Sequence, residues 1–163
     1  MKIKLLSPSD VTESYVNWFT NKEVVKYSDN QYRSFSLEGQ RLYVENCFND
    51  NAIRLYGVFI DEMHIGNILL DGVGSIHKRA ELTYVIGEQK YWGQGIASNA
   101  IANIIEISKK EYKLNKLYAG IAKNNIGSRK VLENNGFELE GTRKKHLYYN
   151  NFFEDQLDFG LIL

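Results

Sequence analysis

The chain has 163 residues, of which 44% are apolar and 25% are charged, a composition typical of a globular protein with a sizeable core. Its 20 basic and 20 acidic residues cancel, which excludes the positive excess of proteins that bind nucleic acid or anionic membranes. The single cysteine, Cys47, excludes an intramolecular disulfide and favours a reducing compartment.

The first residues predict no targeting segment. Residues 1–6 alternate charged with apolar side chains and stop at Ser7-Pro8, unlike the apolar run of a signal peptide or a membrane span. We therefore expect a cytoplasmic protein, and the length favours one domain over residues 1–163. Cys47 lies in an amphipathic pattern, so we expect it to pack in the core and not to act as a nucleophile.

The first half of the chain predicts short helices and a hairpin. Apolar residues recur at helical spacing between Val11 and Phe19, and Ser9 or Asp10 can cap the helix that they define. Further on, a polar pair at 61–62 separates two strand-like runs as a hairpin turn would. In chain order we expect a strand at 3–6, a turn at 7–10, that helix, a short helix near 23–27, a helix from 37 to about 49 after Ser36, strands at 53–60 and 64–70, and a loop at 72–78.

The second half is organised around a strand, a glycine loop and a helix. From Arg79 to about Glu88 the residues alternate and are rich in β-branched and aromatic side chains, while residues 95–111 carry a broad apolar helical stripe. Asn135-Gly136 is a left-handed cap signal. We also expect a strand at 116–122, a short helix from 128 or 129 to 134, and strands at 137–145 and about 154–163 around a turn at 149–152. This order predicts a mixed α/β sheet.

The junction between the strand and the helix is suited to an anion. The first amides of a helix have no partner within it and lie at the positive end of its dipole, so phosphate oxygens can accept their hydrogen bonds. Gly93 and Gly95 leave room for such a ligand, because a Cβ could block it or forbid the backbone angles. The free donors belong to Gln94, Gly95, Ile96 and Ala97, and Ser98 adds a hydroxyl. A tight turn without a ligand is the alternative.

Several other sites are disfavoured. The dinucleotide fingerprint requires a third glycine where the chain has Ser98, and the ATP-binding loop requires a Gly-Lys-Ser/Thr ending that is missing. A Ser-His-Asp hydrolase would need a nucleophile elbow. The three histidines, His64, His77 and His146, are too far apart in sequence to form a ligand pair, so we expect no metal site.

The stretch Trp92-Gly93-Gln94-Gly95-Ile96-Ala97 resembles the acetyl-CoA loop of the GNAT N-acetyltransferase superfamily, Gln/Arg-x-x-Gly-x-Gly/Ala. Trp92 replaces the expected Gln or Arg, but Tyr-Trp-Gly-x-Gly followed by Ala and Ser98 is similar to the subgroup of Rim-type ribosomal-protein N-terminal acetyltransferases. The resemblance covers nearly the whole chain through Ser7-Pro8-Ser9-Asp10, Trp18, Asn125-x-x-Ser128, Asn135-Gly136-Phe137 and Glu140-Gly141.

The resemblance implies the GNAT fold, a mixed, mostly antiparallel sheet of about seven strands flanked by helices, with acetyl-CoA as co-substrate. In the family the pantetheine arm fills a gap between the strand before the loop and the next strand, where unpaired main-chain groups need partners. By position this implies contacts to the backbone of Val85, Ile86 and Gly87 and to Asn125. Without the resemblance Asn125 is a turn residue that satisfies its own backbone.

Acetyl transfer to an amine requires a base, a donor for the developing oxyanion and a proton for the sulfur. Glu81, which begins the strand leading to the thioester, is the expected base, and a solvated carboxylate paired with Arg79 is the alternative. The oxyanion donor is expected among the amides at 85–86. Many GNAT enzymes have a tyrosine acid where this chain has Leu132, and the resemblance implies Ser128 as its replacement. A helix cap is the alternative for Ser128, and water or the nascent ammonium are other proton sources.

The acceptor amine is left open. In the family it enters between the early helices and the last strand pair, where aromatic side chains could stack on a sugar or base or hold a peptide, although core packing is the alternative for most of them. These residues are Tyr15, Trp18, Phe19, Tyr27, Tyr32, Phe35, His146, Tyr148, Tyr149, Phe152 and Phe153.

Three acceptor classes follow: a nucleotide-linked amino sugar, a protein or peptide N-terminus, and a small amine such as a polyamine or an antibiotic. The early acidic residues are dispersed, which favours the first two over a polyamine. A GNAT module that binds CoA without transferring acetyl is the alternative from another class of function. The sequence itself indicates no oligomeric state, although dimers are common in the resembling family, which leaves a homodimer open.

Overall fold

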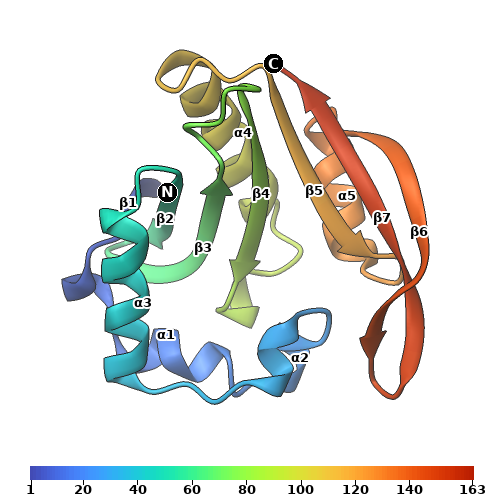
Figure 1. Ribbon diagram of the computed structural model, residues 1–163. Coiled ribbons are helices and arrows are strands. Elements are labelled where there is room, and N and C mark those ends of the chain that lie inside the picture. Colours follow the sequence, from blue (N-terminus) through green and yellow to red (C-terminus); the bar gives the residue numbers. More distant parts are fainter.

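A computed structural model describes residues 1–163, which form a seven-stranded sheet in the order β1-β2-β3-β4-β5-β7-β6 (Figure 1). The strands are β1 (Lys2–Leu5), β2 (Ile53–Ile60), β3 (Met63–Asp71), β4 (Arg79–Ile86), β5 (Lys116–Ala122), β6 (Glu138–Tyr149) and β7 (Phe152–Ile162). All neighbours are antiparallel except the parallel pair β4 and β5. The mixed, mostly antiparallel sheet is therefore confirmed.

Helices cover both faces of this sheet. They are η1 (Pro8–Asp10), α1 (Glu13–Trp18), α2 (Lys22–Val25), η2 (Asp29–Tyr32), α3 (Leu37–Asn49), η3 (Gln89–Tyr91), α4 (Ile96–Lys110) and α5 (Ile126–Asn134). Figure 1 shows α3 in front of the β1–β3 end, α1 and α2 below the sheet, and α4 and α5 behind it. None of these helices is long and apolar enough to cross a membrane.

The buried apolar side chains form two clusters. The larger one joins the central strands to α4 and α5 around Ile101, Ile104 and Leu132. The smaller one joins α1, α2 and α3 to β2, and it contains Trp18 and Cys47. Core packing of Cys47 is thus confirmed, and burial raises the pKa of its thiol, so this sulfur is kept neutral.

The predicted elements are confirmed with different bounds at two helix starts. The first α-helix, α1, begins at Glu13 and is capped by Thr12, not by Ser9 or Asp10. The reason is that the Asp10 carboxylate accepts the Ser7 N–H at 2.9 Å and closes a separate 3₁₀ turn. The last helix begins two residues earlier than expected because Asn125 caps it.

The terminal hairpin is also longer than predicted. Its strands extend to Tyr149 and from Phe152, so the turn consists of Asn150 and Asn151 alone. Both have positive φ, 53° and 67°, which asparagine tolerates in two-residue hairpin turns. Residues 61–62 likewise have φ of 47° and 63°, as the predicted hairpin between β2 and β3 requires.

Candidate functional site

The parallel strands β4 and β5 separate soon after they meet. They are paired only over residues 79–81 and 116–118, and below that point they diverge, as Figure 1 shows. A cleft of about 1130 Å³ lies at the open end, lined by β4, the loop before α4, the start of α5 and residues of α2, η2 and α3. The topology therefore brings the predicted loop, the predicted strand and Asn125 to one site.

Main-chain groups of β4 point into this gap. The Gly87 N–H donates to Ile65 O of β3 at 2.9 Å, and alternate residues of a strand point their polar groups to opposite sides. Tyr84 and Ile86 therefore face the gap, whereas Val85 and Gly87 face β3. The Ile86 carbonyl is already bound by the Trp92 indole N–H at 2.7 Å, so at Ile86 only the N–H is left for a ligand.

The glycine loop has the backbone that an anion site needs. Gly93 and Gly95 have φ of 74° and 75°, and Gly95 is the residue before the first turn of α4. The α4 amides that lack helical partners face the cleft, since Ile96, Ala97 and Ser98 line it. Gln94 is turned away, because its side chain donates to the Lys90 carbonyl at 2.6 Å.

The start of α5 forms the opposite wall. The Asn125 Oδ1 accepts the Ser128 N–H at 3.1 Å, so Asn125 is the helix cap and its Nδ2 is left for other partners. The Ser128 hydroxyl is free of the capping role and lines the cleft. Across the gap, Tyr84 donates its hydroxyl to the Ser128 carbonyl at 3.2 Å. Burial raises the pKa of Tyr84 to about 12, so this hydroxyl is protonated.

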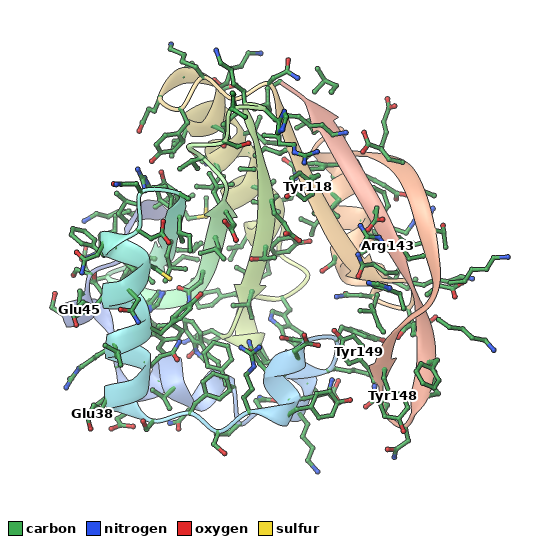
Figure 2. All side chains as sticks on the ribbon, viewed as in Figure 1. Glu38, Glu45, Tyr118, Arg143, Tyr148 and Tyr149 are labelled. Atoms are coloured by element: carbon green, nitrogen blue, oxygen red, sulfur yellow. The ribbon has the colours of Figure 1, made fainter.

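Glu81 lies outside the cleft lining. It belongs to a smaller polar depression of about 560 Å³, together with Tyr118 and Arg143. Figure 2 labels Tyr118 and Arg143 over the β5–β7–β6 part of the sheet. It stands two residues before Thr83, which does line the cleft, on the same side of β4. Burial and the nearby Asp71 carboxylate raise the pKa of Glu81, against the opposing effect of Arg143.

Leu132 and Trp18, both singled out in the sequence analysis, pack in the core of the protein. Leu132 is fully buried in the cluster behind the sheet, so this position holds no proton donor. Trp18 is buried against Gly87, where an added Cβ would lie 1.9 Å from the indole ring, and its N–H donates to Glu88 at 3.0 Å. Gly87 is thus required by packing, and it does not line the cleft.

The expected aromatic residues divide into two groups. Tyr15, Phe19, Tyr27 and Phe35 line the acceptor end of the cleft. The residues of the β6–β7 hairpin, His146, Tyr148, Tyr149, Phe152 and Phe153, do not. Figure 2 shows Tyr148 and Tyr149 at the end of that hairpin, where the Tyr149 hydroxyl donates to Asp29 at 3.1 Å and the Tyr32 hydroxyl donates to the Tyr148 carbonyl at 2.7 Å.

The cleft also contains side chains that no sequence pattern indicated. Arg33 and Lys130 are cationic, Tyr84 is described above, and Gln40 and Asn67 are carboxamides that are only 5% and 6% exposed. The alternation of β4 could have drawn attention to Tyr84. Gln40 and Asn67 lie far apart in the sequence, and only the packing of α3 against the sheet brings both to the cleft.

The family model of the acetyltransferase (GNAT) domain matches residues 1–138 of this chain. The probable N-acetyltransferase YjcK of Bacillus subtilis is 32% identical over 130 residues, 74% of this chain and 70% of that protein. The ribosomal-protein-serine acetyltransferase of Escherichia coli is 28% identical over 102 residues, 63% of this chain and 56% of that protein. A crystal structure of spermidine N-acetyltransferase from Vibrio cholerae in complex with CoA and spermine has a TM-score of 0.86 and 21% identity, covering 99% of this chain and 94% of that chain.

Proposed function

Because this chain belongs to the GNAT acetyltransferase family and is an acetyl-CoA-dependent N-acetyltransferase, we propose that its acceptor is a primary amine on a neutral or anionic molecule. The two classes are a protein or peptide N-terminus and a nucleotide-linked amino sugar, and a polyamine is disfavoured. The observation that carries this proposal is the charge of the cleft. Its lining includes Lys26, Arg33 and Lys130 but only one carboxylate, Glu23.

The charges at the acceptor end act against a polycation. The Glu23 carboxylate lies 3.7 Å from the Lys26 ammonium, so the two largely cancel and Arg33 remains uncompensated there. A polyamine carries several positive charges at neutral pH and needs carboxylates to hold them. A phosphate, or a carboxylate near the amine, is attracted instead.

The relatives include both classes, because the spermidine N(1)-acetyltransferase of Escherichia coli is also 25% identical over 96% of this chain. The choice between the classes therefore rests on the charge of the cleft. The Escherichia coli relative, at 28% identity, is named a ribosomal-protein-serine acetyltransferase. The Vibrio cholerae spermidine enzyme shares the fold, but at 21% identity it supports no statement about the acceptor.

We assign the glycine loop to the pyrophosphate of acetyl-CoA. The amides at 94–97 and the Ser98 hydroxyl lie at the start of α4, where they can bind phosphate oxygens. The space in front of Gly93 and Gly95 is open to the phosphate, because an added Cβ at either glycine would meet no atom within 4 Å. Lys130, a residue of α5 that lines the cleft, can donate hydrogen bonds to further phosphate oxygens. The pantetheine arm then runs from this loop along the open edge of β4 and brings the thioester to Ile86, opposite the Asn125 Nδ2.

The chain supplies groups for each proton transfer. Glu81 accepts a proton from the acceptor ammonium through water, since it stands one pleat beyond the cleft-lining Thr83. The neutral amine attacks the thioester carbonyl, whose oxygen is held by the Ile86 N–H. When the carbon–sulfur bond breaks, the thiolate takes a proton from Ser128, which regains one from water, or from the product ammonium.

The proposal is tested by thiol release from acetyl-CoA with a panel of amines. The panel holds a peptide with a free N-terminus and an acidic second residue, a nucleotide-linked 4-amino sugar, and spermidine. Peptide or sugar is expected to react with a kcat/KM at least about tenfold above that of spermidine, the effect of one unfavourable charge contact. A preference for spermidine would overturn the proposal.

A further inference from the structure

The left-handed cap that the sequence predicts at the end of α5 is formed by Gly136, and it does not need the Asn135 side chain. Gly136 has φ of 81°, whereas Asn135 has φ of −99°. The Gly136 N–H donates to the Glu133 carbonyl at 3.0 Å, and the Phe137 N–H donates to the Leu132 carbonyl at 3.1 Å. The backbone therefore ends the helix by itself, and the polar group of Asn135 has other partners.

The Asn135 side chain joins the end of α5 to the start of α4. Its Nδ2 lies 2.8 Å from the Val131 carbonyl, one turn earlier in α5, and 3.0 Å from the Ser98 hydroxyl. A carbonyl oxygen can only accept, so the Asn135 atom that faces Val131 is the NH₂ group, and its two protons serve one partner each. The Ser98 oxygen is therefore the acceptor in this contact.

This contact fixes what the Ser98 hydroxyl can do for a ligand. A hydroxyl has one proton, and an oxygen that accepts from Asn135 keeps that proton for a different partner. The hydrogen bond with Asn135 is the one that the Ser98 hydroxyl makes within the protein. Ser98 is the third residue of α4 and lines the cleft beside the unpartnered amides of that helix. Its proton is thus available to an anion at the helix start.

We propose that Asn135 is a positioning residue for the binding of acetyl-CoA. It holds the Ser98 oxygen as an acceptor, so that the Ser98 proton is donated to a phosphate oxygen, a hydrogen bond strengthened by the charge of the phosphate. Without Asn135 the hydroxyl can donate to a backbone carbonyl three or four residues earlier, as serines in helices often do, and the phosphate loses a donor. The role of Asn135 rests on the proposed function, in which the glycine loop binds the pyrophosphate.

The test measures the Kd for CoA by isothermal titration calorimetry with the full-length protein. Asn135→Leu keeps the side-chain size and removes the donor, and Ser98→Ala removes the hydroxyl. We expect the Kd to rise about fivefold in Ser98→Ala and about threefold in Asn135→Leu, because a phosphate oxygen loses all or part of one hydrogen bond. The double variant should have the Kd of Ser98→Ala alone, because Asn135 acts through Ser98.

Two acetyl donors separate positioning from a general loss of structure. S-acetylpantetheine has the thioester and the pantetheine amides of acetyl-CoA but no phosphate. With the amine of the panel that reacts fastest, Asn135→Leu should raise the KM for acetyl-CoA about threefold and leave kcat unchanged. The kcat/KM for S-acetylpantetheine should change by less than about twofold, because this donor makes no contact with the Ser98 proton.

The matched control is Asn103→Leu. Asn103 is an exposed residue of α4 outside the cleft, and its Nδ2 donates to the Asn99 carbonyl at 2.8 Å, the same contact with the residue four earlier that Asn135 makes with Val131. This variant should keep the wild-type Kd. An unchanged Kd in Asn135→Leu, losses that add in the double variant, or equal losses with both acetyl donors would overturn the role of Asn135. If Asn135→Leu does not fold, as judged by circular dichroism, Asn135→Ala decides.

A further variant, Gly95→Val, distinguishes failure of this role from failure of the proposed function. If Gly95→Val abolishes CoA binding while Ser98→Ala leaves the Kd unchanged, the loop binds the pyrophosphate without the Ser98 hydroxyl, and only the role of Asn135 is refuted. If neither variant alters the Kd, the assignment of the loop to the pyrophosphate is itself wrong.

Discussion

Glycines of the central stretch are required for two different reasons. At Gly93 and Gly95 the φ angles are in the left-handed region and an added Cβ would meet no atom within 4 Å. There the backbone angle and the approach of a ligand explain the glycine. At Gly87 the Cβ would overlap the Trp18 ring, so the glycine serves the packing of α1 against β4. One sequence motif thus contains residues of the site and residues of the fold.

Gly95→Val is expected to lose CoA binding while the protein stays folded. Valine at positive φ costs on the order of 1–2 kcal/mol of stability, which a domain of this size tolerates. Its branched side chain occupies the space that the phosphate needs, so the Kd for CoA should rise by more than about tenfold. Isothermal titration calorimetry with CoA measures the affinity, and circular dichroism checks the fold.

Gly141→Val is the matched control for that variant. An added Cβ at Gly141 also meets nothing within 4 Å, but its φ is not positive and it does not line the cleft. Its CoA affinity should equal that of the wild type. An unchanged affinity in Gly95→Val as well would place the phosphate elsewhere.

The variant Glu81→Gln tests whether the Glu81 carboxylate is the catalytic base or only affects the stability of the fold. Burial and Asp71 raise the pKa of Glu81 in the folded state above its ordinary value of 4.5. Such a group contributes stability below 4.5, and that stability is lost as the pH rises through the folded pKa. Glutamine does not ionise, so the variant should gain thermal stability relative to the wild type between pH 4 and pH 7, while its turnover falls if Glu81 is the base.

The measurements for Glu81→Gln are Tm at both pH values and kcat with a saturating amine. Glu138→Gln, at an exposed carboxyl of β6, should keep full turnover. Full turnover in Glu81→Gln too would remove Glu81 from the reaction. A Tm advantage that shrinks as the pH rises would contradict the stated origin of the pKa shift.

At the scale of the elements, the site depends on one short pairing. β4 and β5 share only residues 79–81 and 116–118, and past this contact the facing edge of β4, apart from the Ile86 carbonyl, is open for a ligand amide to pair with. The sequence predicts the strand, the loop and α4, because periodicity and glycine spacing are local signals. It also predicts Asn125 at the opposite wall, through the resemblance of Asn125-x-x-Ser128.

What the sequence does not predict depends on contacts between distant segments. Which β4 residues face the gap is set by the register with β3, and the Trp92 bond to the Ile86 carbonyl is visible only when the loop is folded. The separation of Glu81 from the cleft follows from where β5 ends its pairing. Gln40 and Asn67 both line the cleft because α3 packs against the sheet, and neither belongs to a motif.

Asn125→Ala tests the capping residue of α5. Loss of the cap should destabilise the protein by about 1 kcal/mol, because the Ser128 N–H loses its partner. CoA affinity should fall as well, since the Asn125 side chain also faces the cleft. Asn124→Ala is the control, because the neighbouring Asn124 uses its backbone N–H to bind Glu154 and its side chain makes no protein hydrogen bond.

Chemical denaturation and CoA titration distinguish the two roles of Asn125. A stability loss with unchanged CoA affinity would limit Asn125 to capping. Unchanged stability would contradict the observed cap.

At the scale of the whole molecule, the cleft has two ends that are built by different layers. The loop before α4, the first turn of α4 and the start of α5 supply the end with the amides at 94–97, whereas α2, η2 and α3 supply the acceptor end. Figure 1 shows α4 and α5 behind the sheet. The chain as a whole is neutral, with 20 basic and 20 acidic residues, so any preference for a charged acceptor has to come from residues inside the cleft. Arg33 is the cation at the acceptor end that has no nearby carboxylate partner.

Arg33→Glu is therefore expected to change which acceptor the enzyme prefers. Reversing one charge in a partly solvated cleft should lower kcat/KM for a peptide with an acidic second residue by about fivefold and raise that for spermidine by a similar factor. Both changes should shrink in 0.5 M salt, because ions screen charges that are not buried. Lys109→Glu makes the same change at an exposed residue of α4 outside the cleft and should alter neither value. If Arg33→Glu left the ratio of the two kcat/KM values constant, the charge of the acceptor end would not select the amine.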